Sequence, residues 1–474
     1  MKLNLLTGGF IYGTVTIFSR IVSIISIPIL TRLLSPLEYG VLSMMLTVVQ
    51  LFNFIATLEV AQAVTLFFTD RNLKNRDLYP STAIRFSLTM YILLLIIIAI
   101  FGEFIAGIFG NVAIGSRMIL AGALLMSVNG LFFSIQNQLR LEFKTKWYAA
   151  LTIGFVLLTS FGGIGGAIYY SKPAEGVILG QATGAFIISL IGTGLLWKRF
   201  STGFSLIKLR QMLKFSLPLV PAGLLLLSSQ QVAKFILGIY GNLEDVGIFG
   251  LAYQIAGFSG LAVLGVQTAI TPSILANHHE LETPKMLGRL FDIFTIVSLI
   301  FCTFLSVFSH EIVLLFSTPS YLRAANFVPF LAFAIAINSL YIFFPGKIIK
   351  GKSAKQLTAS IGSFLIAIVT GFILIRLDGL RGAALSVLLS AAAFFFIWCY
   401  ISQKLYHLPI KWAKLFKSTV LAAIVCTVGM FLIPNGTTVY LLFIKCALLI
   451  LFSCVIGWTY LQEIWKKYIL KNGM

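Results

Sequence analysis

One arginine lies in the middle of the first long apolar segment of the chain. Arg20 precedes Leu30 by ten residues, so a helix rising 1.5 Å per residue places it about 15 Å from the end of that segment. An ionised side chain at that depth costs about 2.5–3.5 kcal/mol on insertion scales and cannot extend to water. Thr16 and Ser23 share its helical face. We therefore expect Arg20 to form a cationic, hydrogen-bonding wall of a central cavity; the alternative is a packing arginine bound to neighbouring carbonyls.

The second apolar segment carries polar residues level with Arg20. Gln50 follows Gly40 by ten residues and Asn53 continues its face, so both are expected to line the same cavity and contact substrate. Glu59 lies farther along, and a straight helix would leave it over roughly 10 Å below Arg20, too far for a direct ion pair. Its carboxylate is a candidate for proton or cation coupling; the alternative is a partner for basic residues on that side.

A third cation and several weaker candidates complete the set. Lys234 lies about six residues from the outer end of the seventh apolar segment, one turn after Gln230. It is expected to add positive charge to the outer half of the cavity or, alternatively, to extend outward to water. Other ionisable residues near segment ends are expected at the membrane interface: Asp292, His310, Glu311, Arg323 and Lys445. His278 and His279 have no cysteine nearby, so neither a metal site nor a cofactor is predicted.

These residues must be positioned by helices that cross a membrane. Apolar types make up 59% of the 474 residues and charged types 11%, whereas soluble domains carry about 25% charged residues. The chain is a succession of apolar runs about 20 residues long, each able to cross a ~30 Å hydrocarbon core. Segments such as Tyr91 to Ile100 do not alternate as the strands of a β-barrel do. The sequence therefore predicts an all-α polytopic membrane protein with about 14 transmembrane helices, including ones centred near Gly257 and Ile335.

Basic residues occupy alternate connections between the predicted helices. Twenty-six of the 35 Lys and Arg residues lie on the side of the N-terminus, six lie on the opposite side, and three lie within helices. Cytoplasmic loops carry such an excess, so both termini are predicted to be cytoplasmic. The formal net charge of +20 is then mainly a topology signal, with some side chains available to anionic lipid headgroups, and no nucleic acid partner is expected. The five cysteines lie inside apolar runs and are expected to serve as packing residues.

A short repeat predicts how the helices are grouped. Ser35-Pro-Leu-Glu-Tyr-Gly-Val-Leu opens the second predicted helix, and Gly241-Asn-Leu-Glu-Asp-Val-Gly-Ile-Phe opens the eighth. The two motifs are six helices apart, so the halves would run parallel about an axis along the membrane normal. We predict an N-terminal six-helix bundle over 1–200, a second six-helix bundle over 201–405, and an additional helix pair with a cytoplasmic tail over 406–474. A cleft would lie between the bundles.

The segment from Ser19 to Val64 resembles a known family. Its motifs are Ser19-Arg20, Pro28-Ile-Leu-Thr-Arg32 and Leu34-Ser-Pro-Leu-Glu-Tyr-Gly40. They are similar to the N-terminal signature of bacterial polysaccharide flippases, the Wzx-type transporters of O-antigen and capsule in the MOP superfamily. MATE exporters and the lipid II flippase are relatives in that superfamily. The resemblance extends more diffusely through the helix count, the short connections and a Lys-rich turn near Lys347 to Lys355.

The resemblance implies a function in surface polysaccharide (O-antigen, lipopolysaccharide) biosynthesis at the bacterial inner membrane. The substrate would be an undecaprenyl-diphosphate-linked oligosaccharide, moved by alternating access that a proton or sodium gradient drives. Further partners would be membrane lipids and other polysaccharide-assembly membrane proteins. Arg20 and Arg32 match cavity cations of the family, where a guanidinium would bind the diphosphate. A MATE-type drug exporter and a membrane glycosyltransferase or polymerase are alternatives; the cationic interior disfavours the first and the short loops disfavour the second.

Overall fold

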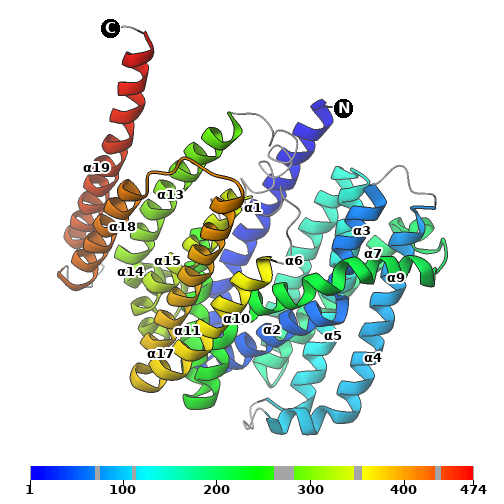
Figure 1. The fold of residues 1–474 in the computed structure, drawn as a ribbon. Coiled ribbons are helices and arrows are strands. Elements are labelled where there is room, and N and C mark those ends of the chain that lie inside the picture. The colour runs from blue at the N-terminus through cyan, green and yellow to red at the C-terminus, as the bar shows by residue number, and fades with distance from the viewer. Residues whose placement is uncertain are drawn as a thin grey trace. The chain divides into compact units, whose positions relative to one another are not determined.

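A computed structural model describes residues 2–69, 75–108, 114–260, 282–345, 355–432 and 439–472. Throughout these ranges the regular structure is helical (Figure 1), which confirms the all-α prediction. The chain forms two compact units, Met1–Gly250 with Ser353–Gly379, and Leu251–Lys352 with Leu380–Met474. His278 and His279 lie outside the described residues.

The first unit contains the N-terminal helices and the start of the internal repeat's second copy. Its helices are α1 Lys2–Leu33, α2 Pro36–Thr57, α3 Val60–Thr69, α4 Leu78–Ile108, α5 Ser116–Leu141, α6 Thr145–Tyr169, α7 Pro173–Leu195, α8 Trp197–Phe200, α9 Leu206–Ser216, α10 Val220–Tyr240 and the first part of α11 Leu243–Ala256. The second unit contains α13 Thr283–Val307, α14 Ser309–Phe316, the 3-10 helix Pro319–Asn326, α15 Val328–Ser339, α18 Trp412–Thr427 and α19 Val439–Asn472. The long α17, Lys355–Leu405, contributes to both units, because Asp378 and Gly379 interrupt it with non-helical backbone angles.

Eleven helices in the described ranges are long and apolar enough to cross a membrane, and a bent pair, Pro319–Asn326 with Val328–Phe343, makes a twelfth. In that count α17 appears once despite its interruption. The helix predicted near Gly257 is described only to residue 260. The polytopic architecture is therefore confirmed, whereas the count of 14 is not confirmed helix by helix. The bundle limits over 1–200, 201–405 and 406–474 stay a prediction.

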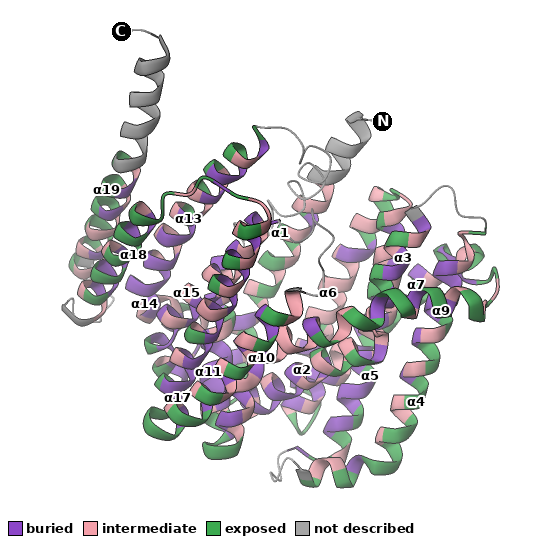
Figure 2. Cartoon of the chain, in the orientation of Figure 1, coloured by how far each residue is buried: buried purple, intermediate pink, exposed green. Residues whose placement is uncertain are grey.

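Large apolar side chains are exposed along the outer faces of the helices. Ile96 is 51% exposed, Phe104 72% and Phe161 65%, and Figure 2 shows exposed residues in green at intervals along α4. A soluble protein rarely exposes apolar patches of this extent, because each Å² left in water forgoes about 25 cal/mol of burial energy. Hydrocarbon tails remove that penalty. The exposed apolar surface is thus the surface that lipid covers.

Glycines draw α6 and α7 together, as their small-xxx-small spacing predicts. A Cβ built on Gly162 would lie 2.3 Å from the carbonyl oxygen of Gly180, and one built on Gly166 would lie 1.9 Å from that of Gly176. A side chain at either position would force the two backbones apart. The close packing of α6 on α7 therefore depends on these glycines.

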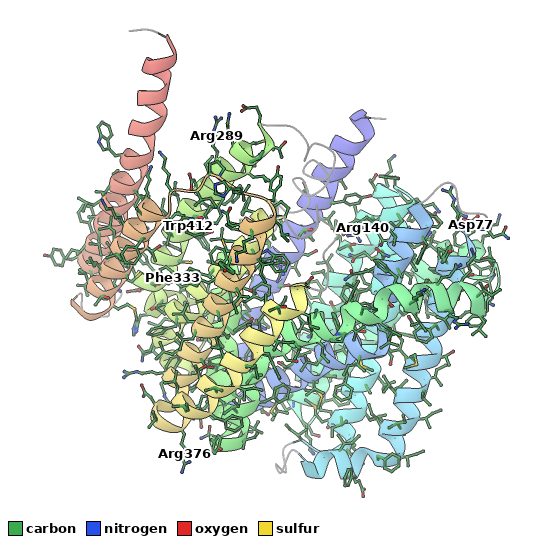
Figure 3. The ribbon with its side chains drawn as sticks, in the orientation of Figure 1. Asp77, Arg140, Arg289, Phe333, Arg376 and Trp412 are labelled. Atoms are coloured by element: carbon green, nitrogen blue, oxygen red, sulfur yellow. The ribbon has the colours of Figure 1, made fainter. Side chains whose placement is uncertain are left out.

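Charged residues lie at opposite ends of the first unit. In Figure 3, Arg140 and Asp77 lie at one end of this unit and Arg376 lies at the other. Arg140 belongs to a connection predicted on the lysine-rich side, and Arg376 to one predicted on the lysine-poor side. These positions agree with the predicted sides for the two connections, and the topology of the whole chain stays a prediction.

An ion cluster holds the lysine-rich end of the first unit. The Arg199 guanidinium contacts Asp77 at 2.6 Å and Glu142 at 2.8 Å, and Lys144 contacts Glu142 at 2.8 Å. Burial alone would raise the pKa of the Glu142 carboxyl, but hydrogen bonds from Lys144 and Gln138 and the charge of Arg199 leave that pKa below its usual value. Glu142 is accordingly charged at neutral pH and fixes the connection between α5 and α6.

In the second unit, a buried ion pair joins α19 to α14. The Lys445 ammonium donates to the Glu311 carboxylate at 2.6 Å, and Lys445 is 0% exposed. Lys445 is therefore enclosed by protein, and the expectation that both residues lie at the depth of the membrane interface stays a prediction. A lysine this deep in protein requires an opposite charge, and Glu311 provides it from a helix 134 residues away in sequence.

Candidate functional site

The two copies of the repeat meet through a pair of glycines, both within the first unit. A Cβ built on Gly40 would lie 1.7 Å from the carbonyl oxygen of Leu243, and one built on Gly247 would lie 1.9 Å from the carbonyl oxygen of Pro36. Each helix therefore presents the carbonyl of its first residue to the glycine four residues into the other helix. A real Cβ atom essentially never lies within 3.0 Å of a non-bonded heavy atom, so this junction of α2 and α11 requires glycine on both sides.

Both helices also begin with the same kind of cap. The Ser35 hydroxyl accepts a hydrogen bond from the Glu38 backbone N–H, and the Glu38 carboxylate accepts one from the Ser35 N–H. In the second copy the Asn242 side-chain oxygen accepts a hydrogen bond from the Asp245 N–H at 2.8 Å. The repeat in the sequence is thus a repeat in local structure. Two parallel copies related by a local two-fold axis would contact each other in this reciprocal way, each glycine meeting the first carbonyl of the other helix.

Lys234 lies buried on α10, below this glycine junction. Its ammonium donates to the Thr47 hydroxyl at 3.3 Å, and the side chain is 8% exposed. The Thr47 hydroxyl lies 3.5 Å from the Gln231 side-chain oxygen. Thr47 follows Gly40 by seven residues, which is about 10 Å along α2. The alternative in which Lys234 extends outward to water is therefore wrong, and the cation is enclosed by protein.

One face of α2 packs against α10 and α11 along most of its length. A Cβ built on Gly250 would lie 2.5 Å from the Ser43 hydroxyl oxygen, and one built on Gly223 would lie 2.3 Å from the Phe54 ring. Thr47 lies between these two positions on the same helical face. Gln50 also falls on this stripe and its side chain is exposed. The structure thus groups Gln50 with Thr47 on the face of α2 that meets α10.

Asn53 has different neighbours from Gln50 and contacts α4. Its side-chain oxygen accepts a hydrogen bond from the Tyr91 hydroxyl of α4 at 2.7 Å. A Cβ built on Gly130 of α5 would lie 1.6 Å from that hydroxyl, so α5 approaches the same point. Asn53 therefore ties α2 to α4 and α5, and its expected contact with substrate stays a prediction.

Both arginines of α1 have exposed side chains. Within the described parts of the chain, no carboxylate forms an ion pair with Arg20. Arg32 donates to the carbonyl oxygen of Pro28 at 2.9 Å, one turn back in its own helix. An arginine facing lipid at the depth of Arg20 would cost about 2.5–3.5 kcal/mol. The exposed surface around Arg20 is therefore expected to face water rather than hydrocarbon.

Glu59 lies in a break rather than on a straight helix. α2 ends at Thr57, and Leu58 and Glu59 have φ angles of 45° and 55°, in the left-handed region that favours glycine. Non-glycine residues there cost about 1–3 kcal/mol each and cluster at functional sites. The Glu59 carboxylate accepts a hydrogen bond from the Gln62 side chain in α3. The straight helix assumed for its depth is therefore wrong, and its coupling role stays a prediction.

Two partners in this site were not predicted from the sequence. Thr47 carries no charge and looks like one more polar residue in an apolar helix, yet its hydroxyl accepts a hydrogen bond from the Lys234 ammonium. Gln231, three residues before Lys234, lies against Thr47 in place of the expected Gln230. The glycine pair could have been found from the sequence. When the two repeat copies are aligned with Pro36 opposite Leu243, Gly40 lies opposite Gly247.

Internal repeats related by a local axis are common among membrane transporters, and the contact of the two repeat copies at Gly40 and Gly247 is of that kind. The chain belongs to the polysaccharide biosynthesis protein family, whose sequence model matches residues 29–326. The resemblance seen in the Ser19 to Val64 segment is thereby confirmed.

Solved structures of MOP-superfamily transporters share the fold. The lipid II flippase MurJ in an inward closed conformation has 14% sequence identity, covers 96% of this chain and 99% of its own, and gives a TM-score of 0.73. An inward-facing multidrug resistance MATE transporter has 15% identity, covers 81% and 94%, and gives 0.62. An outward-facing multidrug resistance MATE transporter has 17% identity, covers 85% of this chain and 94% of its own, and gives a TM-score of 0.57. No curated protein matches the chain in sequence. Family and fold together define a flippase-type transport protein of the membrane.

Proposed function

We propose that this protein translocates an undecaprenyl-diphosphate-linked oligosaccharide across the bacterial inner membrane by ion-coupled alternating access. The membership in a polysaccharide biosynthesis family supports a glycan substrate. The observation that carries the proposal is the enclosed Lys234, held by Thr47 next to the junction of Gly40 and Gly247. Both termini would be cytoplasmic, so that the glycine junction closes the outer end of the cavity.

The chemistry of the cavity follows from its cations. When α2 separates from α10 and α11, the Lys234 ammonium loses Thr47 and becomes available to a diphosphate. Arg20 would bind the same group at mid-depth, since a guanidinium can donate two parallel hydrogen bonds to phosphate oxygens. Gln50 would contribute a neutral hydrogen-bonding group suited to sugar hydroxyls. Opening toward the outside would thus expose Lys234 while Arg20 retains the substrate.

A MATE-type exporter of cationic drugs is the second candidate, because solved MATE transporters share the fold. Such a substrate would meet Lys234 and Arg20 with a charge of the same sign. Repulsion between like charges in a low-dielectric cavity disfavours its binding. Transport of an ethidium-like cation by purified protein in vesicles, with no movement of a lipid-linked glycan, would favour this candidate instead.

Deletion of the gene tests the function directly. We expect loss of one surface polysaccharide and accumulation of its lipid-linked precursor in the inner leaflet, with both restored by the wild-type gene. Extraction of lipid-linked glycans, followed by mass spectrometry, measures the precursor. Normal surface polysaccharide together with increased drug sensitivity would contradict the proposal.

Replacement of Lys234 by methionine is expected to reduce polysaccharide export at least about tenfold. Methionine retains much of the side-chain length but removes the cation that a diphosphate would bind. The fold should survive, since replacing a buried charge by an apolar side chain is often neutral or stabilising. Surface polysaccharide and melting temperature in detergent are the measurements. Lys445→Met is the matched control: it removes a second lysine that is buried in the described part of the chain, leaves Glu311 without this partner, and should lower the melting temperature instead.

Replacement of Glu59 by glutamine is expected to uncouple transport from the ion gradient. Glutamine keeps the shape and the hydrogen bond to Gln62 but cannot bind a proton or a metal cation as a carboxylate does. Export in inverted vesicles, measured with and without a proton or sodium ionophore, checks this. Glu103→Gln, at an exposed position of α4, should retain coupling. An unchanged ionophore response of Glu59→Gln would remove Glu59 from the coupling mechanism.

A further inference from the structure

A small cavity lies in the first unit, where the break after α2 meets α4 and α5. Its volume is about 30 Å³, similar to the volume of about 30 Å³ that one molecule occupies in liquid water. Its polar lining comes from Thr57 of α2, Ser87 of α4, and Ser134, Asn137 and Gln138 of α5. The cavity is therefore too small for a glycan or a lipid and has the size of one water molecule or one ion.

The side-chain oxygen of Gln138 is a buried acceptor at this cavity. Gln138 is 2% exposed, and its Nε2 donates to the Glu142 carboxylate at 2.7 Å. That bond fixes which end of the amide carries the nitrogen, because an ionised carboxylate can only accept. Oε1 is therefore directed away from Glu142, toward Ser134, which lies one turn earlier on the same face of α5. This buried oxygen accepts no hydrogen bond from the part of the chain that the structure describes, which is costly unless a ligand satisfies it.

The hydroxyl groups at the cavity offer acceptors in the same way. Thr57 Oγ1 and Ser134 Oγ each donate to a carbonyl oxygen one turn back in their own helix, both at 3.0 Å. Each hydroxyl has a single proton, so only its lone pairs are left for a ligand. Asn137 Nδ2 lies 3.3 and 3.5 Å from two acceptors of α3, to which it can donate both of its protons. Apart from the hydroxyl of Ser87, the polar lining thus presents oxygen atoms and no free protons.

The end of α2 adds negative potential at the same point. Thr57 is the last residue of α2, and the C-terminal end of a helix carries about half of a negative elementary charge. Interrupted membrane helices use such ends to coordinate sodium ions. No carboxylate is among the residues that line the cavity, whereas protein sites for divalent cations usually contain one. The lining therefore favours a monovalent cation held by neutral oxygen atoms.

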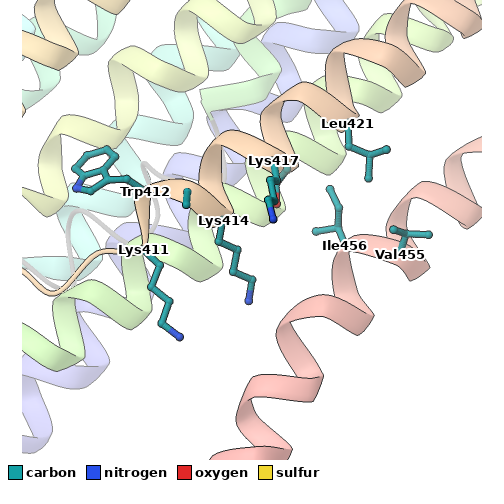
Figure 4. A pocket seen from close by; sticks show the side chains of 9 residues that line it. Lys411, Trp412, Lys414, Lys417, Leu421, Val455 and Ile456 are labelled. Atoms are coloured by element: carbon teal, nitrogen blue, oxygen red, sulfur yellow. The ribbon is translucent and has the colours of Figure 1, made fainter.

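Charge distinguishes this cavity from the larger groove of about 660 Å³ between α18 and α19 in the second unit (Figure 4). Three lysines of α18, Lys411, Lys414 and Lys417, are among the residues that line that groove. Ammonium groups only donate hydrogen bonds, and they repel a cation. An added cation is therefore expected to bind at Gln138 and not in the groove.

We propose that the cavity at Gln138 binds one Na⁺ ion. Its ligands would be Gln138 Oε1 and the hydroxyl oxygens of Thr57, Ser87 and Ser134. The ion would join the end of α2 to α4 and α5, and would thereby stabilise the break between α2 and α3. Glu59 is not among the residues that line the cavity, so this site is separate from the carboxylate proposed for ion coupling. Binding to the folded chain requires no transported substrate, and its test is independent of the proposed translocation.

Thermal unfolding of the detergent-purified full chain, in NaCl and in choline chloride of equal ionic strength, tests the site. We expect a saturable rise in the melting temperature with NaCl, because a ligand that binds only the folded state stabilises it by mass action. Choline is too large for the cavity and should give no such rise. Gln138→Met should abolish the difference between the two salts. Ser134→Ala and Thr57→Val should each raise the Kd for Na⁺ on the order of tenfold, as expected for the loss of one contact to a charged group.

Ser127→Ala is the matched control. Ser127 lies on α5 two turns before Ser134, donates at 2.8 Å to a carbonyl oxygen of its own helix in the same way, and does not line the cavity. This variant should bind Na⁺ like the wild type. Equal melting temperatures of the wild type in the two salts would show that the cavity holds water only and would overturn the proposal. An undiminished response of Gln138→Met to NaCl, or equal weakening by Ser127→Ala, would do the same. If Gln138→Met does not fold, Ser134→Ala and Thr57→Val decide the question.

Discussion

Replacing Gly40 with alanine is expected to stop transport and to leave the outer end of the cavity open. Alanine normally stabilises a helix interior by about 0.5–1 kcal/mol relative to glycine. Here its methyl group would lie 1.7 Å from the Leu243 carbonyl oxygen. Restoring van der Waals contact requires α2 and α11 to separate by about 1–2 Å. Because the blocking atom is backbone, no side-chain rotation can relieve the clash.

Accessibility next to the junction measures this opening. In a background without the five native cysteines, Ser43→Cys should react with a membrane-impermeant maleimide faster when Gly40→Ala is present. Gly165→Ala is the control, because a Cβ built on Gly165 meets nothing within 4 Å. It should export polysaccharide normally. Normal export by Gly40→Ala, with Ser43→Cys still protected, would show that the junction does not act as a gate.

A disulfide between α2 and α11 can instead hold the glycine junction closed. A Cβ built on Gly250 would lie 2.9 Å from the Ser43 Cβ, and disulfides need about 3.5–4.5 Å, so a small separation of the helices allows the bond. Oxidation of Ser43→Cys with Gly250→Cys is expected to stop export by holding the junction closed, and a reductant should restore it. The reversal separates a locked gate from a misfolded protein.

The fold class and the internal repeat could be predicted from the sequence because both depend on local patterns. Apolar runs of membrane length predict helices whatever their partners, and the motifs at Ser35 and Asn242 are caps whose hydrogen bonds lie within one turn. The α6–α7 contact was predictable for the same reason, since Gly162 and Gly166 leave one helical face without side chains.

Long-range partners could not be predicted in the same way. Lys234 could be recognised as a costly buried cation, but nothing in the sequence selects Thr47, which is 187 residues away, as its acceptor. Lys445 could be placed near a helix end, but nothing in the sequence selects its partner, a carboxylate on α14. The break at Leu58 and Glu59 contains neither glycine nor proline, so the usual signals for a helix end were absent.

The site accordingly divides into two kinds of residue. Gly40 and Gly247 are fixed by backbone contacts, and their proposed role depends on motion at one junction. Lys234 is held beside them by Thr47, but its proposed role is to bind substrate. Gln50 and Arg20 are exposed within the same unit, and their roles depend on the substrate that they meet. Mutations in the first group should change the opening of the cavity, and mutations in the second should change only substrate binding.

Arg20 gives the sharpest test of the second kind, because Arg20→Ala is expected to abolish surface polysaccharide while the protein inserts and accumulates normally. The exposed guanidinium forms no ion pair with a described carboxylate, so its removal leaves no buried charge behind. Arg20→Lys should restore part of the export, since lysine keeps the charge but loses the paired donors. Arg117→Ala, which removes an exposed arginine from the start of α5, should export normally. Undiminished export by Arg20→Ala would show that the arginine serves packing alone.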